Sequence, residues 1–181
     1  MTPRFLLMTR LPEPGLGMLR EGVKIMHEAW TTGTATLDGK YYQVDGAIVQ
    51  PQPLQEGGIP FWIAGGGEKV TLKIAAKYAS YTNFAGSLEE FDHKNEVLRG
   101  HCADIGRDEA EIVRSTNLNT VVGETEAEVS ERIAAIEARV RPYLGDRTDG
   151  FIAEYHSPNA MVGTPEQIVE KLQERAAHGL G

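Results

Sequence analysis

The chain has 181 residues, of which 41% are hydrophobic and 24% are charged, a composition typical of one globular domain. The formal net charge is −8, from 18 basic and 26 acidic residues, which argues against nucleic-acid and anionic-membrane surfaces because both need basic patches. A single cysteine, Cys102, excludes an internal disulfide and a cysteine-rich zinc site, and we expect no metal centre.

The N-terminal stretch carries only a short apolar run, Phe5–Met8, which two prolines and an acid follow. This pattern does not fit a secretory signal. No part of the chain approaches the roughly 18 consecutive apolar residues of a membrane-spanning helix. Together with the single cysteine, these features predict a cytoplasmic protein with no membrane partner.

An amphipathic helix and a β-hairpin are predicted next. The helix has one apolar face and ends near Gly33; the face is formed by Leu19, Val23, Met26 and Trp30. The hairpin spans residues 34–44, because Asp38-Gly39 lies between two short strand-like pairs and suits a type I′ turn with positive φ at both central residues.

Strands and helices alternate in the rest of the chain. Strands are predicted at residues 61–64, 81–84 and 112–122, and helices at 69–79 and from Ser87, Thr125 and Thr164. The last three helices begin with capping-box patterns, in which an acid or Gln stands three residues after a Ser or Thr. This order predicts an α/β fold with about three parallel strands, flanking helices and the inserted hairpin, in one domain over residues 1–181.

Three consecutive glycines, Gly65–Gly67, stand between the first of these strands and its helix. Bare backbone at a helix N-terminus exposes amide groups that can bind an anion such as phosphate. The residues that follow match neither the dinucleotide fingerprint nor the nucleotide P-loop. The alternative interpretation is a tight turn in which the glycines serve packing, and the acidic Glu68 beside the loop favours that alternative.

The segment PFWIAGGGEKVTLKIAAKYASYTNF resembles the fifth-strand region of the bacterial luciferase-like flavin and deazaflavin (coenzyme F420) oxidoreductases. Other segments resemble the same family in the same order: LREGVKIMHEAWT, LDGKYYQVDGAIVQPQPLQ, HCADIGRDEAEIVRS and VGTPEQIVEKLQERAAHGLG. Each motif alone is weak, but together they cover nearly the whole chain. The stretch before Leu16 has the weakest resemblance.

The resemblance implies a partial (β/α)₈ barrel, in which this chain is the second half, with core elements over residues 61–122. It implies that backbone amides of Gly65, Gly66, Gly67 and Glu68 hold the phosphate of coenzyme F420 or, alternatively, of FMN. The chemistry would be hydride transfer or oxygenation of a small-molecule substrate. In this family the early strands of the barrel supply the groups beside the reactive ring, and these strands have no counterpart in this chain. The resemblance therefore assigns no catalytic residue here.

A second hypothesis is a non-catalytic half-barrel that self-associates through open sheet edges, and either way we expect a homo-oligomer. Trp62 is predicted to lie in the core beneath the glycine loop. Asn117 and Asn119 are candidates for a barrel mouth. The histidines, among them His93 and His101, are assigned to packing or solvent.

Overall fold

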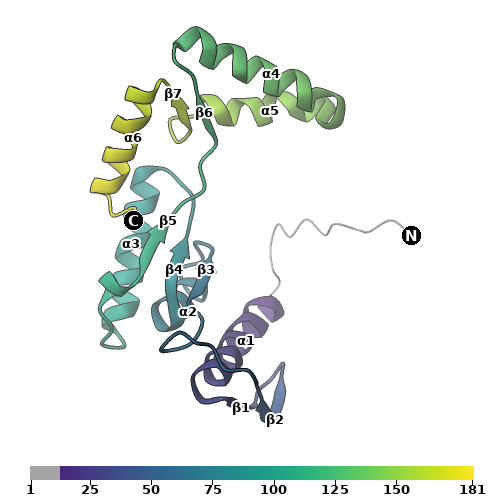
Figure 1. The fold of residues 1–181 in the computed structure, drawn as a ribbon, viewed down its shortest axis with the longest axis vertical. Helices are drawn as coiled ribbons and strands as arrows, with labels where there is room; N and C mark the ends of the chain where they lie inside the picture. The colour runs from purple at the N-terminus through teal and green to yellow at the C-terminus, as the bar shows by residue number, and fades with distance from the viewer. Residues whose placement is uncertain (1–12) are drawn as a thin grey trace.

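A computed structural model describes residues 13–181. Its elements form an elongated arrangement in which two groups flank a central sheet (Figure 1). Helix α1 (Glu13–Thr32) and a hairpin lie at one end, and helices α4 (Glu126–Leu144) and α5 (Thr148–Ala153) lie at the other. The prediction about a secretory signal falls on residues 1–12, outside the described range. No helix within that range is long and apolar enough to cross a membrane.

Helix α1 confirms the first predicted helix and ends where Gly33 adopts φ 85°. The amide of Gly33 donates to the carbonyl of Ala29 at 3.0 Å. Val23 is buried against the central core, whereas Met26, on the same predicted face, is exposed.

The hairpin is confirmed, but its predicted turn is wrong. Strands β1 (Thr34–Asp38) and β2 (Gln43–Ile48) are antiparallel, and Asp38 pairs with Gln43, so four residues connect them. Neither Asp38 nor Gly39 has positive φ. The Glu21 carboxylate of α1 instead accepts hydrogen bonds from the amides of the connection, at 2.8–3.0 Å, and these tertiary bonds set its shape.

The central sheet has three parallel strands, the number predicted, in the order β3 (Phe61–Ala64), β4 (Ala79–Asn83), β5 (Val113–Ser115). Helices α2 (Thr71–Tyr78) and α3 (Leu88–Ala103) follow β3 and β4. They pack on one face of the sheet, where a core of small and branched side chains is buried; this core includes Ile63, Ile74, Ala75, Ala76, Ala79, Leu98, Cys102 and Ile112.

Among residues 13–181 no helix packs on the opposite face of this sheet, and Trp62 lies on that face. Trp62 is 60% exposed, so its prediction as a core residue is wrong. Side chains alternate along a strand, and because Ile63 is buried beneath the helices, Trp62 must project from the other face. Its indole stacks on the ring of Tyr81, which pairs with it in β4, with ring centroids 5.0 Å apart.

The prediction of a single strand over residues 112–122 is wrong. This segment contains two strands, β5 and β6 (Thr120–Val122), with residues 116–119 between them. β5 pairs with β4, whereas β6 pairs in parallel with β7 (Met161–Gly163), which was not predicted. The chain therefore leaves one sheet and enters another within a few residues (Figure 1).

The predicted helix starts are present, with one difference in the caps. Ser87 forms the full capping box with Glu90 at the start of α3, and the amide of Thr164 donates to Gln167 at the start of α6 (Pro165–Ala177). Thr125 accepts from the amide of Glu128, but the Glu128 carboxylate accepts from the amide of Glu124 instead of closing the box. A smaller core joins α4, α5 and β6 through Val121, Val129, Ile133 and Ile152.

Candidate functional site

The glycine loop leaves the end of β3 and leads into α2, as the sequence predicts. Gly65 has φ +116°, a conformation that side-chain-bearing residues rarely adopt. Its amide donates to the carbonyl of Asn83 at 2.7 Å and so extends the pairing of β3 with β4. The Gly65 amide is therefore engaged within the protein, which removes it from the four predicted anion donors.

The next three amides differ from that of Gly65. Within residues 13–181, the backbone N–H groups of Gly66, Gly67 and Glu68 have no hydrogen-bond acceptor. The carbonyl of Gly67 accepts from the amide of Leu72 at 2.9 Å, which fixes the loop against the first turn of α2. A cavity of about 350 Å³ adjoins the loop, and its lining includes Gly67, Glu68 and Lys94.

The Glu68 side chain contacts helix α3. Its carboxylate forms an ion pair with the ammonium group of Lys94, and His93 Nε2 lies 3.1 Å from the same oxygen. The Lys94 hydrogen bond lowers the pKa of Glu68 more than desolvation raises it, and His93 adds to the lowering. His101 Nε2 lies 2.8 Å from the Glu68 carbonyl oxygen. The acid beside the loop is thus neutralised by a neighbouring cation.

Sequence reasoning missed these three partners on α3. The spacing of seven residues between Lys94 and His101 indicates one helix face, because two helical turns separate them. Nothing in the sequence links that face to Glu68, which precedes it by more than 20 residues. The aliphatic part of Lys94 also covers the loop: its Cε would lie 3.3 Å from a Cβ atom at Gly66.

Polar side chains gather at the carboxyl ends of β4 and β5. The amide nitrogen of Asn83 donates to Ser115 Oγ at 3.0 Å and to Asn117 Oδ1 at 3.4 Å. Asn119 does not join them through its side chain; its carbonyl accepts from the amide of Met161. In parallel sheets ligands bind outside the carboxyl ends of strands, which is also where the glycine loop lies.

Residues 10–181 match the profile of the luciferase-like monooxygenase family. The chain belongs to this family. The resemblance inferred from the sequence is therefore confirmed, and the α/β fold agrees with solved structures of luciferase-like enzymes.

Individual relatives of this luciferase-like chain are oxidoreductases. It is 46% identical over 97 residues to an F420-dependent glucose-6-phosphate dehydrogenase of Mycobacterium leprae, covering 52% of this chain and 28% of that protein. Its fold resembles the F420-dependent tetrahydromethanopterin reductase of Methanopyrus kandleri, with a TM-score of 0.70 and 18% identity over 92% of this chain and 56% of that one. It also resembles a monooxygenase of Streptomyces bottropensis, with a TM-score of 0.72 and 15% identity over 93% and 53% of the two chains. The chain thus spans less than two thirds of each relative.

Proposed function

We propose that this chain is part of an F420-dependent oxidoreductase that acts on a small-molecule substrate, with FMN as the alternative cofactor. The dehydrogenase and reductase relatives carry F420 in their names, which supports the deazaflavin. When bound, such a cofactor accepts or donates a hydride. Oxygenation of the substrate is the alternative reaction, because the family is described as luciferase-like monooxygenases.

The proposed role of the glycine loop is to bind the cofactor's phosphate. The amides of Gly66, Gly67 and Glu68 would donate to phosphate oxygens at the N-terminal end of α2, where the helix dipole favours a negative charge. Gly65 would contribute by shaping the turn. The single observation that carries this proposal is that these three consecutive amides lack acceptors within residues 13–181 beside a cavity of about 350 Å³.

We further propose that the described fold corresponds to the second half of a (β/α)₈ barrel. The uncovered face of β3, β4 and β5 would then belong to the barrel interior, and helices α2 and α3 to its outer layer. This chain covers just over half of the length of each of the two solved structures compared above, which supports this correspondence. No described residue is assigned a catalytic role.

The second candidate function is the non-catalytic half-barrel that associates with another copy. The exposure of Trp62 on the open sheet face favours it, because large aromatic side chains are seldom left in water on a sheet face. The two proposals differ in what covers that face, and both allow a homo-oligomer.

The experiment is a fluorescence titration of the purified chain with F420 and with FMN, each compared with the same chromophore lacking its phosphate. Charge-assisted hydrogen bonds contribute about 1.5–3 kcal/mol each, so the phosphate-bearing form should bind at least about tenfold more tightly. Lys94→Gln should reduce this preference, whereas Arg139→Gln, at an exposed position on α4, should not. Equal affinity for both forms would reject the phosphate role.

A further inference from the structure

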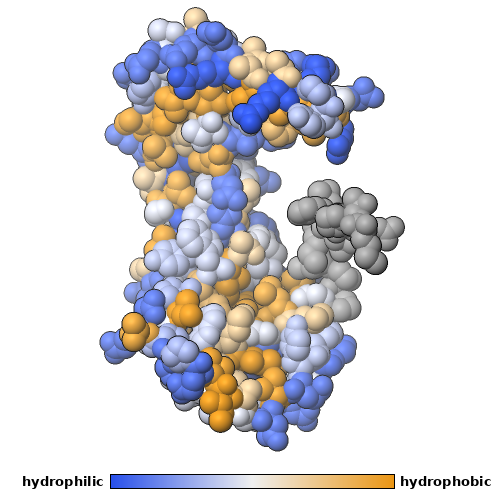
Figure 2. Space-filling model, turned by 45° about the vertical axis from the view of Figure 1, so that its right-hand side comes forward, coloured by the Kyte–Doolittle hydropathy of each residue, from blue (hydrophilic) through white to orange (hydrophobic). Residues whose placement is uncertain are grey.

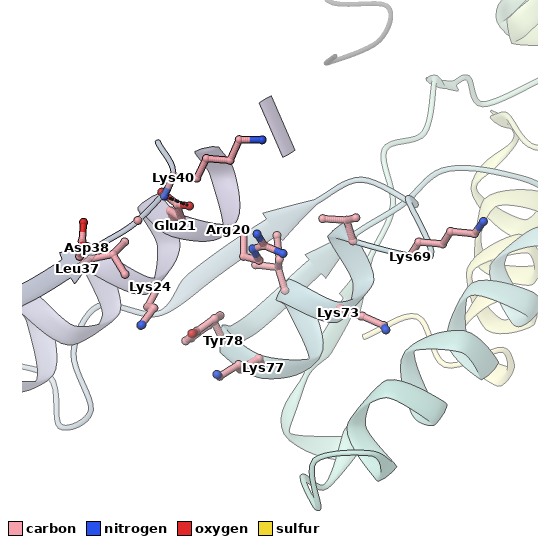
Figure 3. A pocket seen from close by; sticks show the side chains of 13 residues that line it. Arg20, Glu21, Lys24, Leu37, Asp38, Lys40, Lys69, Lys73, Lys77 and Tyr78 are labelled. Carbon is pink, nitrogen blue, oxygen red and sulfur yellow. Dashed lines mark hydrogen bonds between the residues drawn. The ribbon is translucent and has the colours of Figure 1, made fainter. Parts of the chain in front are cut away.

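A second cavity, of about 550 Å³, lies between α1, the turn of the hairpin and α2. Six basic side chains line this cavity, which we call the basic groove: Arg20, Lys24, Lys40, Lys69, Lys73 and Lys77. Figure 3 shows that they come from all three of its walls. The groove adjoins the glycine-loop cavity, since Lys69 and Val70 line both.

This concentration of positive charge is unusual for this chain. The groove holds five of the seven lysines of a protein whose net charge is −8. None of its six cations forms an ion pair with a residue in the described range. Lys40 and Lys77 lie over the rings of Tyr41 and Tyr78, 5.3 Å from the ring centroids, and these contacts leave their charges uncompensated by an anion. A cavity lined by one sign of charge attracts ligands of the opposite sign, so an external anion could pair with these cations.

The two acidic residues of the groove do not cancel this charge. The Glu21 carboxylate accepts three backbone hydrogen bonds from Lys40, Tyr41 and Tyr42, which occupy its oxygens. Asp38 is exposed at the end of β1. Six cations against two acids leave a local excess of four positive charges.

The shape of the groove suits an elongated ligand. Lys73 and Lys77 lie one turn apart on α2, about 6 Å along the helix axis, and Lys69 precedes them at the same sequence spacing. Apolar side chains, including Leu37 and Ile74, also line the cavity, so its walls offer contact to the ligand between its charges. A ligand with several anionic groups along a chain would meet successive lysines.

We infer that the basic groove binds a small polyanion, a molecule with several phosphate or carboxylate groups along a flexible chain. A nucleic acid fits less well, because the overall negative charge of the protein would repel a long polyanion outside the groove. The groove shares Lys69 and Val70 with the glycine-loop cavity, but this inference does not depend on the proposed phosphate role of the glycine loop.

The test is calorimetric titration with tripolyphosphate and with triglutamate at 0.05 and 0.15 M salt, using the wild-type chain and Lys73→Gln/Lys77→Gln. Gln has nearly the same helix propensity as Lys, so α2 should be retained. Loss of the two ion pairs that Lys73 and Lys77 would form with the probe should weaken binding about tenfold. Higher salt should weaken it further. Whichever probe binds more tightly identifies phosphate or carboxylate as the natural group.

The matched control is Arg139→Gln/Arg147→Gln, which removes two exposed positive charges far from the groove in sequence. It should leave the affinity unchanged within a factor of two. Equal weakening by the control, no binding of either probe at 0.05 M salt, or tighter binding of an oligonucleotide would overturn the inference. If circular dichroism shows that the double variant is unfolded, Lys24→Gln on α1 provides the same comparison with an expected threefold loss.

Discussion

The carboxylate of Glu68 forms an ion pair with the ammonium group of Lys94, a residue of the helix that follows the next strand. This contact answers the objection that an acid beside the glycine loop would repel an anion. The negative charge is directed towards α3 and compensated there, while the backbone of Glu68 stays in the loop. In the view of Figure 2, one side of the molecule is concave between its two ends.

The Glu68–Lys94 pair predicts a dependence of stability on pH. Lys94 holds the pKa of Glu68 below its ordinary value of 4.5 in the folded protein. The pair therefore stabilises the fold fully above pH 4.5, and this contribution is lost as the pH falls through the lower folded pKa. Thermal unfolding of the wild type and Glu68→Gln should show a melting-temperature gap that narrows on acidification below that value. A gap that widens would contradict the pairing.

Substitution of Gly65 should destabilise the protein through the backbone. Gly65→Ala places a side chain at φ +116°, which costs on the order of 1–3 kcal/mol. Crowding adds little, because the new Cβ would lie 3.4 Å from its nearest neighbour, Thr71 Cγ2. Chemical denaturation measures the change.

The control is Gly100→Ala in α3, where no atom outside the adjacent residues and the helix's own backbone lies within 4 Å of the new Cβ. Alanine is the better helix former by about 1 kcal/mol, so this variant should be more stable than the wild type. If Gly65→Ala and Gly100→Ala changed the free energy of unfolding in the same direction, this result would count against the strained conformation assigned to Gly65.

Leu98 anchors α3 in the central core. It is 0% exposed and lies among Ile74, Cys102 and Ile112. Leu98→Ala should lower the free energy of unfolding by about 2–5 kcal/mol, from lost burial and the cavity left behind. Leu172→Ala on α6, at a position that is 45% exposed, should cost less than about 1 kcal/mol. Similar losses at both positions would refute this core assignment.

The uncovered sheet face predicts self-association of the isolated chain. Trp62 and Tyr81 form a stacked aromatic pair there, and a second copy would bury them. Size-exclusion chromatography with light scattering should give a mass above that of the monomer for the wild type, and a smaller mass for Trp62→Ser. Tyr143→Ser, at an exposed position on α4, is the control and should leave the mass unchanged. A monomeric wild type would exclude association through this face.

Local signals in the sequence predicted the elements well. The capping box at Ser87 and the apolar residues of α3 are decided within one or two helical turns, so they can be read directly. The three parallel strands followed from the alternation of strand and helix patterns. The glycine run predicted a turn between β3 and α2, and it is there.

Features that depend on distant contacts could not be read from the sequence. The split of residues 112–122 depends on pairing with β7, a three-residue strand. The position of Trp62 depends on which face of its sheet the helices cover. The engagement of the Gly65 amide depends on Asn83, and the basic groove combines side chains from three separate elements.

The central claim is that three particular amides bind a phosphate, and a ¹H–¹⁵N spectrum of the chain tests it most directly. Titration with inorganic phosphate should move the signals of Gly66, Gly67 and Glu68, while that of Gly65, already bonded to Asn83, should change little. Sulfate of equal ionic strength should move the same signals, and chloride should not. If the three signals stay fixed while others move, the glycine loop is a packing turn and the proposed cofactor site is wrong.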